Sequence, residues 1–274
     1  MKKFTGGWFG KLLRINLTDR TSRVEEIDPA LLYKFVGGAA LGAKILYDEV
    51  SPGSDPLGSE NRLIFTVGPL TGTEAPCASR LYVATTSPLN HALGNALSGG
   101  YFPVEMKWAG FDGIVVEGKA SEPVYVLIKD DAVEIRKAGR YWGLNTQDTQ
   151  MYLKEDLNDH NIRIACIGPA GENLSLISCI INECRAVARK GVGAVMGSKN
   201  LKAIAVRGSK KVPIADQKKF KEATKEFLRY LKENELVYPV FAQTGTSLAV
   251  GATSALGFFP AKNWQDTGVE DLAP

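Results

Sequence analysis

Short apolar runs separated by polar turns dominate the first two thirds of the chain. Apolar and polar residues alternate in 11–17 and 23–27 on either side of a polar turn, and this pattern predicts a β-hairpin. Residues 123–128 and 132–136 repeat the pattern and predict a second hairpin. Further strands are expected at the denser apolar runs, which are 63–67, 80–85, 162–167 and 201–206.

Helical signals are fewer and lie between these runs. Asp28 and Pro29 form a cap and first-turn pair for a helix that runs to about residue 36, and a second helical stretch covers 39–49. Residues 146–157 also have helical spacing. Beyond residue 212 the chain becomes rich in lysine and glutamate, and 217–234 reads as an amphipathic helix. We therefore expect a base domain at 1–211 and the beginning of a helical domain at 212–274.

A glycine-proline pattern occurs twice along the chain. Gly68-Pro69-Leu70-Thr71-Gly72 follows the run 63–67, and Gly168-Pro169-Ala170-Gly171 follows the run 162–167. Each copy leads to an arginine, Arg80 or Arg185, then to a glycine group, and then to a strand-like run that ends in glycine and a basic residue. The repeat predicts two related half-domains, each with one arginine.

The glycine group of the second copy is the stretch 191–200, Gly-Val-Gly-Ala-Val-Met-Gly-Ser-Lys-Asn. Glycine permits positive φ and close approach, so such a loop can turn its amides toward an anion as a phosphate cradle. It is not a P-loop, because Ser198-Lys199 reverses the last pair of that motif, and no G-x-G-x-x-G fits these glycines. A tight turn between helix and strand is the alternative, and the sequence leaves both open.

Two matched arginines suit a ligand that carries two anionic groups. The guanidinium fork is always charged and binds phosphate oxygens through paired hydrogen bonds. The alternative is that Arg80 and Arg185 are ordinary surface residues. Neither histidine is assigned chemistry, since His91 and His160 lie in polar turns.

Composition and charge exclude several classes of protein. The 274 residues are 45% hydrophobic and 23% charged with a net charge of +3, which argues against a nucleic-acid partner. No apolar run approaches the length of a membrane span, and we expect a cytoplasmic protein. Cysteines 77, 166, 179 and 184 show no C-x-x-C spacing, so we expect reduced thiols and neither a zinc nor an iron–sulfur site.

Six stretches together resemble the N-terminal domain of the tungsten- or molybdenum-dependent aldehyde ferredoxin oxidoreductases, a family with relatives that act on benzoyl-CoA. They are WFGKLLRINLT at 8–18, GPLTGT at 68–73, SGGYF at 98–102, KWAGFD at 107–112, IGPAGEN at 167–173, and 191–204. The resemblance covers about residues 6–214 in the family's order. It implies an α+β fold: a β-rich pseudo-two-fold base of two sheets with short helices, followed by the start of a helical domain.

The resemblance also implies a ligand and a function. In the family this domain binds a tungsten or molybdenum bis-pterin cofactor whose two phosphates are linked by magnesium. The enzyme converts aldehydes to carboxylates and passes electrons through a [4Fe-4S] cluster to ferredoxin. Motif matching carries over, as cofactor-binding residues, Arg80, Leu97, Gly99, Arg185, Ala186 and Ala188. Leu97 and Ala186 would meet the magnesium through backbone carbonyls, since this cation prefers oxygen ligands.

The chain departs from the family at several positions. Ala39, Leu97 and Ala188 stand where relatives usually have arginine, asparagine and glycine. The family's cluster cysteines lie beyond the region matched, so we expect a fragment or one half of a split enzyme, inactive alone, with no catalytic residue of its own. Its partners would be the remaining C-terminal part or a chain carrying the cluster cysteines, and a ferredoxin-type acceptor. The sequence leaves open whether the protein forms a homodimer. The alternative function is a non-catalytic nucleotide- or phosphometabolite-binding module.

Overall fold

The protein consists of two compact units, one up to residue 215 and one from residue 216 on. The structure is a computed structural model that describes residues 6–269. The strands all lie in the first unit: β1 (Lys11–Asn16), β2 (Thr21–Glu26), β3 (Leu63–Val67), β4 (Leu81–Thr86), β5 (Leu93–Ser98), β6 (Gly113–Glu117), β7 (Val124–Lys129), β8 (Ala132–Lys137), β9 (Arg163–Cys166), β10 (Ile180–Asn182), β11 (Arg185–Val187) and β12 (Leu201–Arg207). Its helices are α1 (Pro29–Phe35), α2 (Gly38–Glu49), α3 (Phe102–Trp108), the 3-10 turn η1 (Gly139–Tyr141), α4 (Thr146–Asp156), α5 (Pro169–Glu172) and α6 (Val192–Ser198).

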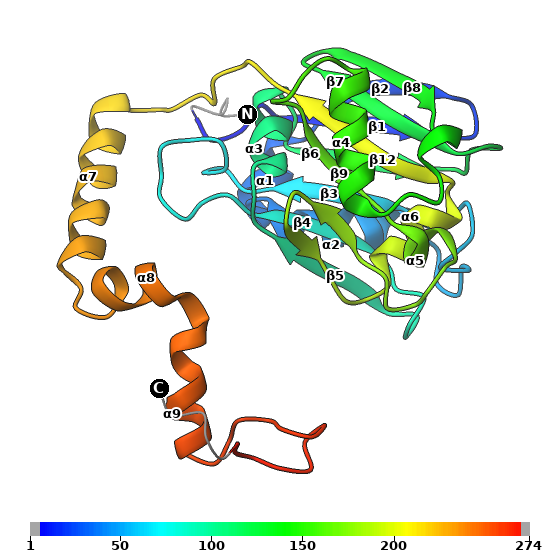
Figure 1. The fold of residues 1–274 in the computed structure, drawn as a ribbon. Coiled ribbons are helices and arrows are strands. Elements are labelled where there is room, and N and C mark those ends of the chain that lie inside the picture. Colours follow the sequence, from blue (N-terminus) through cyan, green and yellow to red (C-terminus); the bar gives the residue numbers. More distant parts are fainter. Residues whose placement is uncertain (1–5, 270–274) are drawn as a thin grey trace. The chain divides into compact units, whose positions relative to one another are not determined.

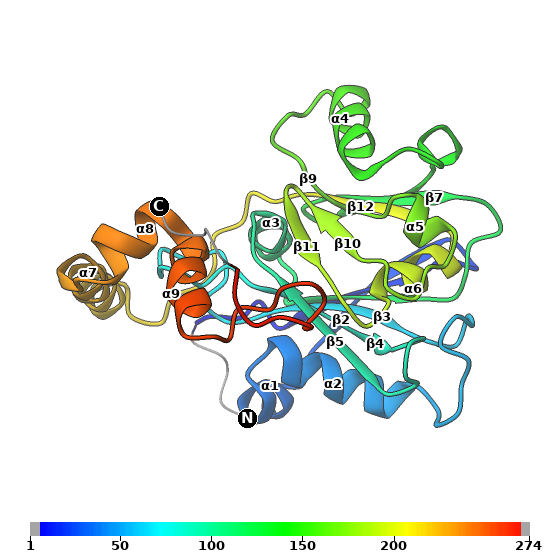
Figure 2. The same cartoon turned by 60° about the horizontal axis from the view of Figure 1, so that its bottom comes forward.

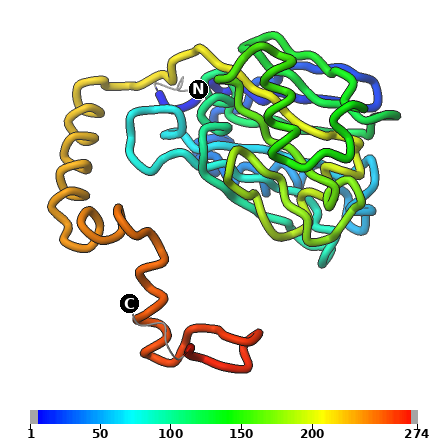
Figure 3. The backbone as a smooth tube through the Cα atoms, viewed as in Figure 1, coloured from blue at the N-terminus to red at the C-terminus, as the bar shows by residue number. Residues whose placement is uncertain are grey.

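The strands of the described residues form two sheets that repeat one topology. Sheet A has the order β2-β1-β6-β3-β4-β5, and sheet B has the corresponding order β8-β7-β12-β9-β10-β11. In each sheet the second and third strands are parallel and all other neighbours are antiparallel. The chain completes sheet A before it begins sheet B (Figure 3). This repetition confirms the predicted α+β base with two related halves.

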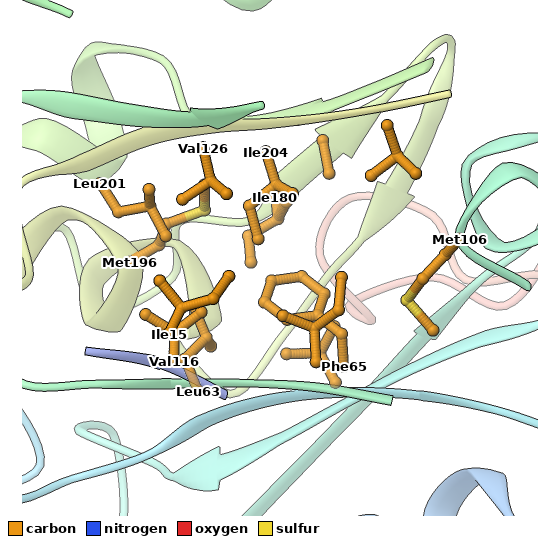
Figure 4. Close-up of a cluster of buried hydrophobic side chains, with 14 of the residues drawn as sticks. Ile15, Leu63, Phe65, Met106, Val116, Val126, Ile180, Met196, Leu201 and Ile204 are labelled. Carbon is orange, nitrogen blue, oxygen red and sulfur yellow. The ribbon is translucent and has the colours of Figure 1, made fainter. Parts of the chain in front are cut away.

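The two sheets face each other across the main core, and helices cover their outer faces. Helices α1 and α2 pack on sheet A, and α4 packs on sheet B (Figures 1 and 2). Strand residues supply the core alternately: Leu13 and Ile15 point between the sheets, whereas Leu12 packs under the helices on sheet A. Met106 of α3 and Met196 of α6 enter the main core from opposite sides (Figure 4).

Local sequence signals explain the elements that were predicted. The turn after β1 places its two strands in register from Lys11 opposite Glu26 to Asn16 opposite Thr21. Asp28 caps α1, because its side chain accepts a hydrogen bond of 2.9 Å from the amide of Ala30. The second predicted hairpin is β7 and β8. Both hairpins and the capped helix are therefore confirmed.

A fully buried lysine links the two sheets at the end of β6. Lys199 Nζ donates to the carbonyls of Asn61 at 2.7 Å and Gly118 at 3.0 Å, and it lies 3.4 Å from that of Ser59. Burial is the main cause that lowers the pKa of Lys199 to about 7. Arg62 and Lys119 lower this pKa further, and Glu117 raises it.

We expect the wild-type protein to gain stability between pH 7 and pH 9, and Lys199→Met to gain less. In this range the unfolded chain, with the ordinary lysine pKa of 10.5, binds a proton that the folded chain lacks. Raising the pH therefore favours the folded state. Above pH 9 the Cys166 thiol, whose pKa burial raises to about 12, acts in the opposite direction. Urea midpoints at pH 7, 8 and 9 measure the effect, and parallel profiles for the two proteins would contradict it.

The second unit consists mainly of helices. They are α7 (Gln217–Glu233), the π-helical turn η2 (Val237–Phe241), α8 (Ala242–Thr244), the 3-10 turn η3 (Gly245–Leu248) and α9 (Ala249–Ala255). Asp216 caps α7 by accepting a hydrogen bond of 3.0 Å from the Lys219 amide. None of the α7 residues is buried, and Phe227 is 45% exposed. The amphipathic pattern of α7 correctly predicts this helix.

Candidate functional site

A hollow of about 580 Å³ lies where the two halves of the first unit meet. It is lined by the loop between β3 and β4, the residues after β5, helix α3 and the start of β11. Because Arg80 and Arg185 both line this hollow, we call it the arginine pocket. Its size is typical of a site for a small ligand or cofactor.

The edges of the two sheets create the pocket. Strand β5 is the last of sheet A and β11 is the last of sheet B, and the two strands pack against each other (Figure 2). The chain leaves β5 at Gly99 and Gly100 and enters β11 at Arg185, and all three residues line the pocket. The seam between the half-domains is therefore the place where residues from both copies meet.

A pair of glycines separates the two arginines. A Cβ atom on Gly99 would lie 3.9 Å from Nη1 of Arg80. A Cβ atom on Gly100, where φ is +101°, would lie 3.5 Å from Cγ of Arg185 and 2.5 Å from Oδ1 of Asn182. Only glycine fits at Gly100, because a side chain would need a strained φ and would collide with Asn182. The Cβ side of Gly100 is therefore filled by neighbouring protein atoms, whereas Gly99 is uncrowded beside Arg80.

The pocket arginines lack carboxylate partners. Within residues 6–269, every arginine other than Arg80, Arg185 and Arg189 has a carboxylate oxygen within 4.0 Å. Arg80 and Arg185 are both exposed side chains. Two positive charges without counter-charges in one hollow favour the binding of an anion.

Side chains from both halves fix the backbone at the glycine pair. Ser79 Oγ donates a hydrogen bond to the carbonyl of Gly100, and Glu183 Oε2 accepts one of 3.1 Å from the amide of Tyr101. Asn182 is fully buried and donates from Nδ2 to Ser98 Oγ at 2.7 Å. Its Oδ1 has no hydrogen-bond partner in the described part of the chain. An unsatisfied buried acceptor beside the pocket is unusual and is consistent with a ligand or water there.

A second hollow of about 410 Å³ adjoins the arginine pocket. Cys77, Ala78 and Arg80 line both hollows. The second hollow is also lined by the N-terminal turn of α2, including Ala39, and by residues 68–71. Arg80 therefore stands between two connected spaces.

The other sequence-predicted site residues lie on the meeting edge strands and do not line the pocket. Leu97 of β5 is 46% exposed and pairs with Tyr82. Ala186 of β11 is exposed and pairs with Ile181, and Ala188 follows that strand, also exposed. The structure thus brings Arg80, Gly99 and Arg185 into one pocket and places the remaining three residues on its flanks.

The structure corrects the interpretation of 191–200 as a phosphate cradle. Residues 192–198 form α6, and every residue of this helix is buried. A Cβ atom on Gly193 would lie 2.7 Å from the carbonyl oxygen of Cys179, and one on Gly197 would lie 2.0 Å from that of Gly171. These glycines allow close packing of backbone on backbone, and none of them lines the arginine pocket.

The equivalence of the two arginines within the repeat is also corrected. Arg80 directly precedes β4, whereas Arg185 is the first residue of β11, the counterpart of β5. They meet because the two edge strands β5 and β11 pack against each other, and they do not occupy matching positions. Sequence reasoning missed Gly100 and Trp108 as lining residues, although both fall within motifs that carried the family resemblance.

Residues 6–269 contain neither a cluster of metal-ligating side chains nor a membrane-spanning helix. No three or more His, Cys, Asp or Glu side chains gather there in a way that could hold a metal ion. In the same residues no helix combines the length and apolar character needed to cross a membrane. All four cysteines are free thiols.

The chain is similar to known oxidoreductases over nearly its whole length. The chain is 46% identical over 269 residues to the tungsten-containing aldehyde ferredoxin oxidoreductase of Pyrococcus furiosus, covering 98% of this chain and 44% of that protein. It is 35% identical over 277 residues to the WOR-like subunit of aliphatic sulfonate oxidoreductase from the same organism, covering 94% of this chain and 43% of that protein. The chain thus spans less than half the length of the curated relatives it matches.

A solved structure shares the fold. The active site complex BamBC of benzoyl coenzyme A reductase, in complex with 1,5 dienoyl-CoA, superposes with a TM-score of 0.83 at 37% identity. The similarity covers 85% of this chain and 36% of that one. Residues 12–208 match the family described as aldehyde ferredoxin oxidoreductase, N-terminal domain. The chain therefore belongs to the aldehyde ferredoxin oxidoreductase family, whose N-terminal domain its first unit represents.

Proposed function

We propose that the first unit binds a tungsten bis-pterin cofactor in an oxidoreductase that converts aldehydes to carboxylates. The observation that carries this proposal is the arginine pocket, where two arginines from different half-domains, neither with a carboxylate partner among residues 6–269, lie beside one glycine pair. A relative that is 46% identical over 98% of the chain is named as tungsten-containing and as acting on aldehydes. The electrons would pass through an iron–sulfur cluster to ferredoxin, with the cluster ligands outside this chain.

The residues present fit a ligand with two phosphate groups. Each guanidinium can donate two parallel hydrogen bonds to a phosphate, and neither is engaged by a carboxylate of the described residues. Gly99 leaves the backbone uncrowded beside Arg80, since only the Ser79 carbonyl oxygen at 3.6 Å and Arg80 Nη1 at 3.9 Å lie near its Cβ position. The second hollow extends the space beside Arg80, as a ligand with two large ring systems requires.

In this proposal the chain binds and orients the cofactor. Arg80 and Arg185 would each bind phosphate oxygens, and Gly99 and Ala188 would leave the backbone accessible beside them. The carbonyls of Leu97 and Ala186, on the two edge strands that pack together, would provide oxygen ligands for magnesium. The metal group supplies the two-electron redox chemistry when it is bound. None of the pocket-lining residues is assigned as a general acid or base.

The decisive test is the composition of the protein isolated from its native source without added metal. We expect tungsten, pterin and phosphate in fixed proportion, with two pterins for each tungsten and with magnesium present. Elemental analysis, pterin fluorescence after oxidation and phosphate assay measure these amounts. A protein that carries nucleotide or another phosphorylated metabolite, with no tungsten, molybdenum or pterin, would show that the site is a phosphate-ligand module instead.

A further inference from the structure

Residues 68–72, the loop that follows β3, form a wall shared by both hollows. Gly68, Pro69, Leu70 and Thr71 line the second hollow, and Gly72 lines the arginine pocket. What fixes this loop therefore shapes both spaces at once.

The last residue of the loop is held by α3. The indole Nε1 of Trp108 donates a hydrogen bond of 2.8 Å to the carbonyl of Gly72. Gly72 has φ +79°, and a Cβ atom there would lie 3.0 Å from that same Nε1. Any side chain at position 72 would be strained and would crowd the indole. The hydrogen bond from Trp108 therefore requires glycine at position 72.

The first residue of the loop contacts the neighbouring residue of the same helix. Lys107 is fully buried, and its Nζ lies 3.4 Å from the carbonyl oxygen of Gly68 and forms an ion pair with Asp112. The other carboxylate oxygen of Asp112 accepts a hydrogen bond of 2.6 Å from the amide of Gly10. Consecutive residues of α3 thus reach the two ends of the loop.

Helix α3 is itself anchored on the opposite half of the unit. Glu105 accepts hydrogen bonds of 2.8 Å from both Arg207 Nη1 and the Gly208 amide, at the end of β12 in sheet B. The carbonyl of Trp108 accepts a further hydrogen bond of 2.8 Å from the Lys210 amide. The helix is therefore a fixed support, and the loop beside sheet A is what it supports.

The loop in turn fixes the backbone that leads to Arg80. Thr71 Oγ1 donates a hydrogen bond of 3.0 Å to the carbonyl of Ala78, two residues before Arg80. Ser79 Oγ binds the carbonyl of Gly100 on the other side. Contacts from α3 therefore continue through Thr71 to the arginine.

We propose that Lys107 and Trp108 are positioning residues that clamp the loop 68–72 and so place Arg80 in the arginine pocket. Lys107 does not line either hollow, so it acts only through the loop. Without the clamp the loop exchanges among several arrangements, and the pocket loses its two-sided geometry. The identity of the ligand rests on the proposed function, whereas the clamp itself does not.

The test uses Trp108→Phe, which removes the indole N–H but keeps an aromatic ring, and Lys107→Met, which removes the buried cation. Lys202→Met is the matched control. Lys202 is equally buried, pairs with Glu172 and donates to the carbonyl of Leu144 at 2.9 Å, and none of these residues lines either hollow.

Two quantities are measured, the first for both the isolated holoprotein and the cofactor-free protein and the second for the holoprotein alone. The first is hydrogen–deuterium exchange of backbone amides in residues 68–80. The second is the tungsten-to-protein ratio after dialysis. We expect at least about fivefold faster exchange in this segment for both clamp variants, the scale of one lost hydrogen bond, and a lower tungsten ratio. Lys202→Met is expected to lower thermal stability and leave both quantities unchanged.

Several outcomes overturn the proposal. One is unchanged exchange of 68–80 in Trp108→Phe, which is the decisive variant if Lys107→Met does not fold. Another is an equal effect of Lys202→Met on both quantities, which would mean that Lys107 matters only for general stability. If the wild-type protein contains no tungsten or pterin, the proposed function fails, and exchange in the cofactor-free protein still decides the clamp.

Discussion

Replacing Gly197 by alanine is expected to destabilise the first unit by about 3 kcal/mol or more. The added Cβ atom would lie 2.0 Å from the carbonyl oxygen of Gly171 and 2.7 Å from its carbon. Both are backbone atoms of α5, which cannot rotate away as a flexible side chain could. Relief requires α5 and α6 to separate, and every residue of α6 is buried. The free energy of unfolding from urea denaturation measures the loss.

Gly139→Ala provides the matched control in the same unit. No atom lies within 4 Å of the position that its Cβ would occupy, and its φ is not positive. Its free energy of unfolding is expected to change by no more than about 0.5 kcal/mol. If Gly197→Ala kept wild-type stability and lost only phosphate binding, α6 would be a ligand cradle and our packing argument would be wrong.

The elements that sequence alone predicted are those with local causes. The hairpins of β1–β2 and β7–β8 follow from alternation around short turns, and Asp28 supplies its own cap hydrogen bond. The repeated glycine-proline pattern correctly indicated two related halves, because each copy follows β3 or its counterpart β9.

The errors arose where tertiary packing overrides local propensity. Three glycines in 191–197 disfavour a helix in isolation, yet α6 forms because those glycines let its backbone pack against Cys179 and Gly171. Sequence analysis predicts no strand at β5, which contains Asn95 and lies at a sheet edge with every second residue exposed. The three-residue strands β10 and β11 are too short to show a period.

The candidate site was predictable in residue type and not in arrangement. Family motifs supplied Arg80, Gly99 and Arg185, and the structure brings these three into one pocket. The reason for their proximity is the packing of β5 against β11, which is a contact between edges of different sheets. Such a contact leaves no periodic trace in the sequence. The partners at the glycine pair, such as Asn182, were missed for the same reason.

The largest effect on ligand binding is expected from the double variant Arg80→Ala/Arg185→Ala. Each arginine should contribute a charge-assisted hydrogen-bond pair of about 1.5–3 kcal/mol, or at least tenfold in affinity. If the two arginines bind different phosphates of one ligand, their losses add, and the double variant should bind more than about 100-fold more weakly. Tungsten, pterin and phosphate would then leave the protein together during dialysis, and their ratios to one another would stay constant in every variant.

Two control variants separate this outcome from general damage to the fold. Arg136→Ala removes a half-buried arginine of β8, which pairs with Glu134 at the opposite edge of sheet B, and it should retain the full cofactor content. Leu97→Ala should also retain it, because only the backbone carbonyl of Leu97 is expected to meet magnesium. A different result would contradict the single-ligand pocket: if each single arginine variant removed half of the bound phosphate and left the affinity for the rest unchanged, Arg80 and Arg185 would serve two independent ligands.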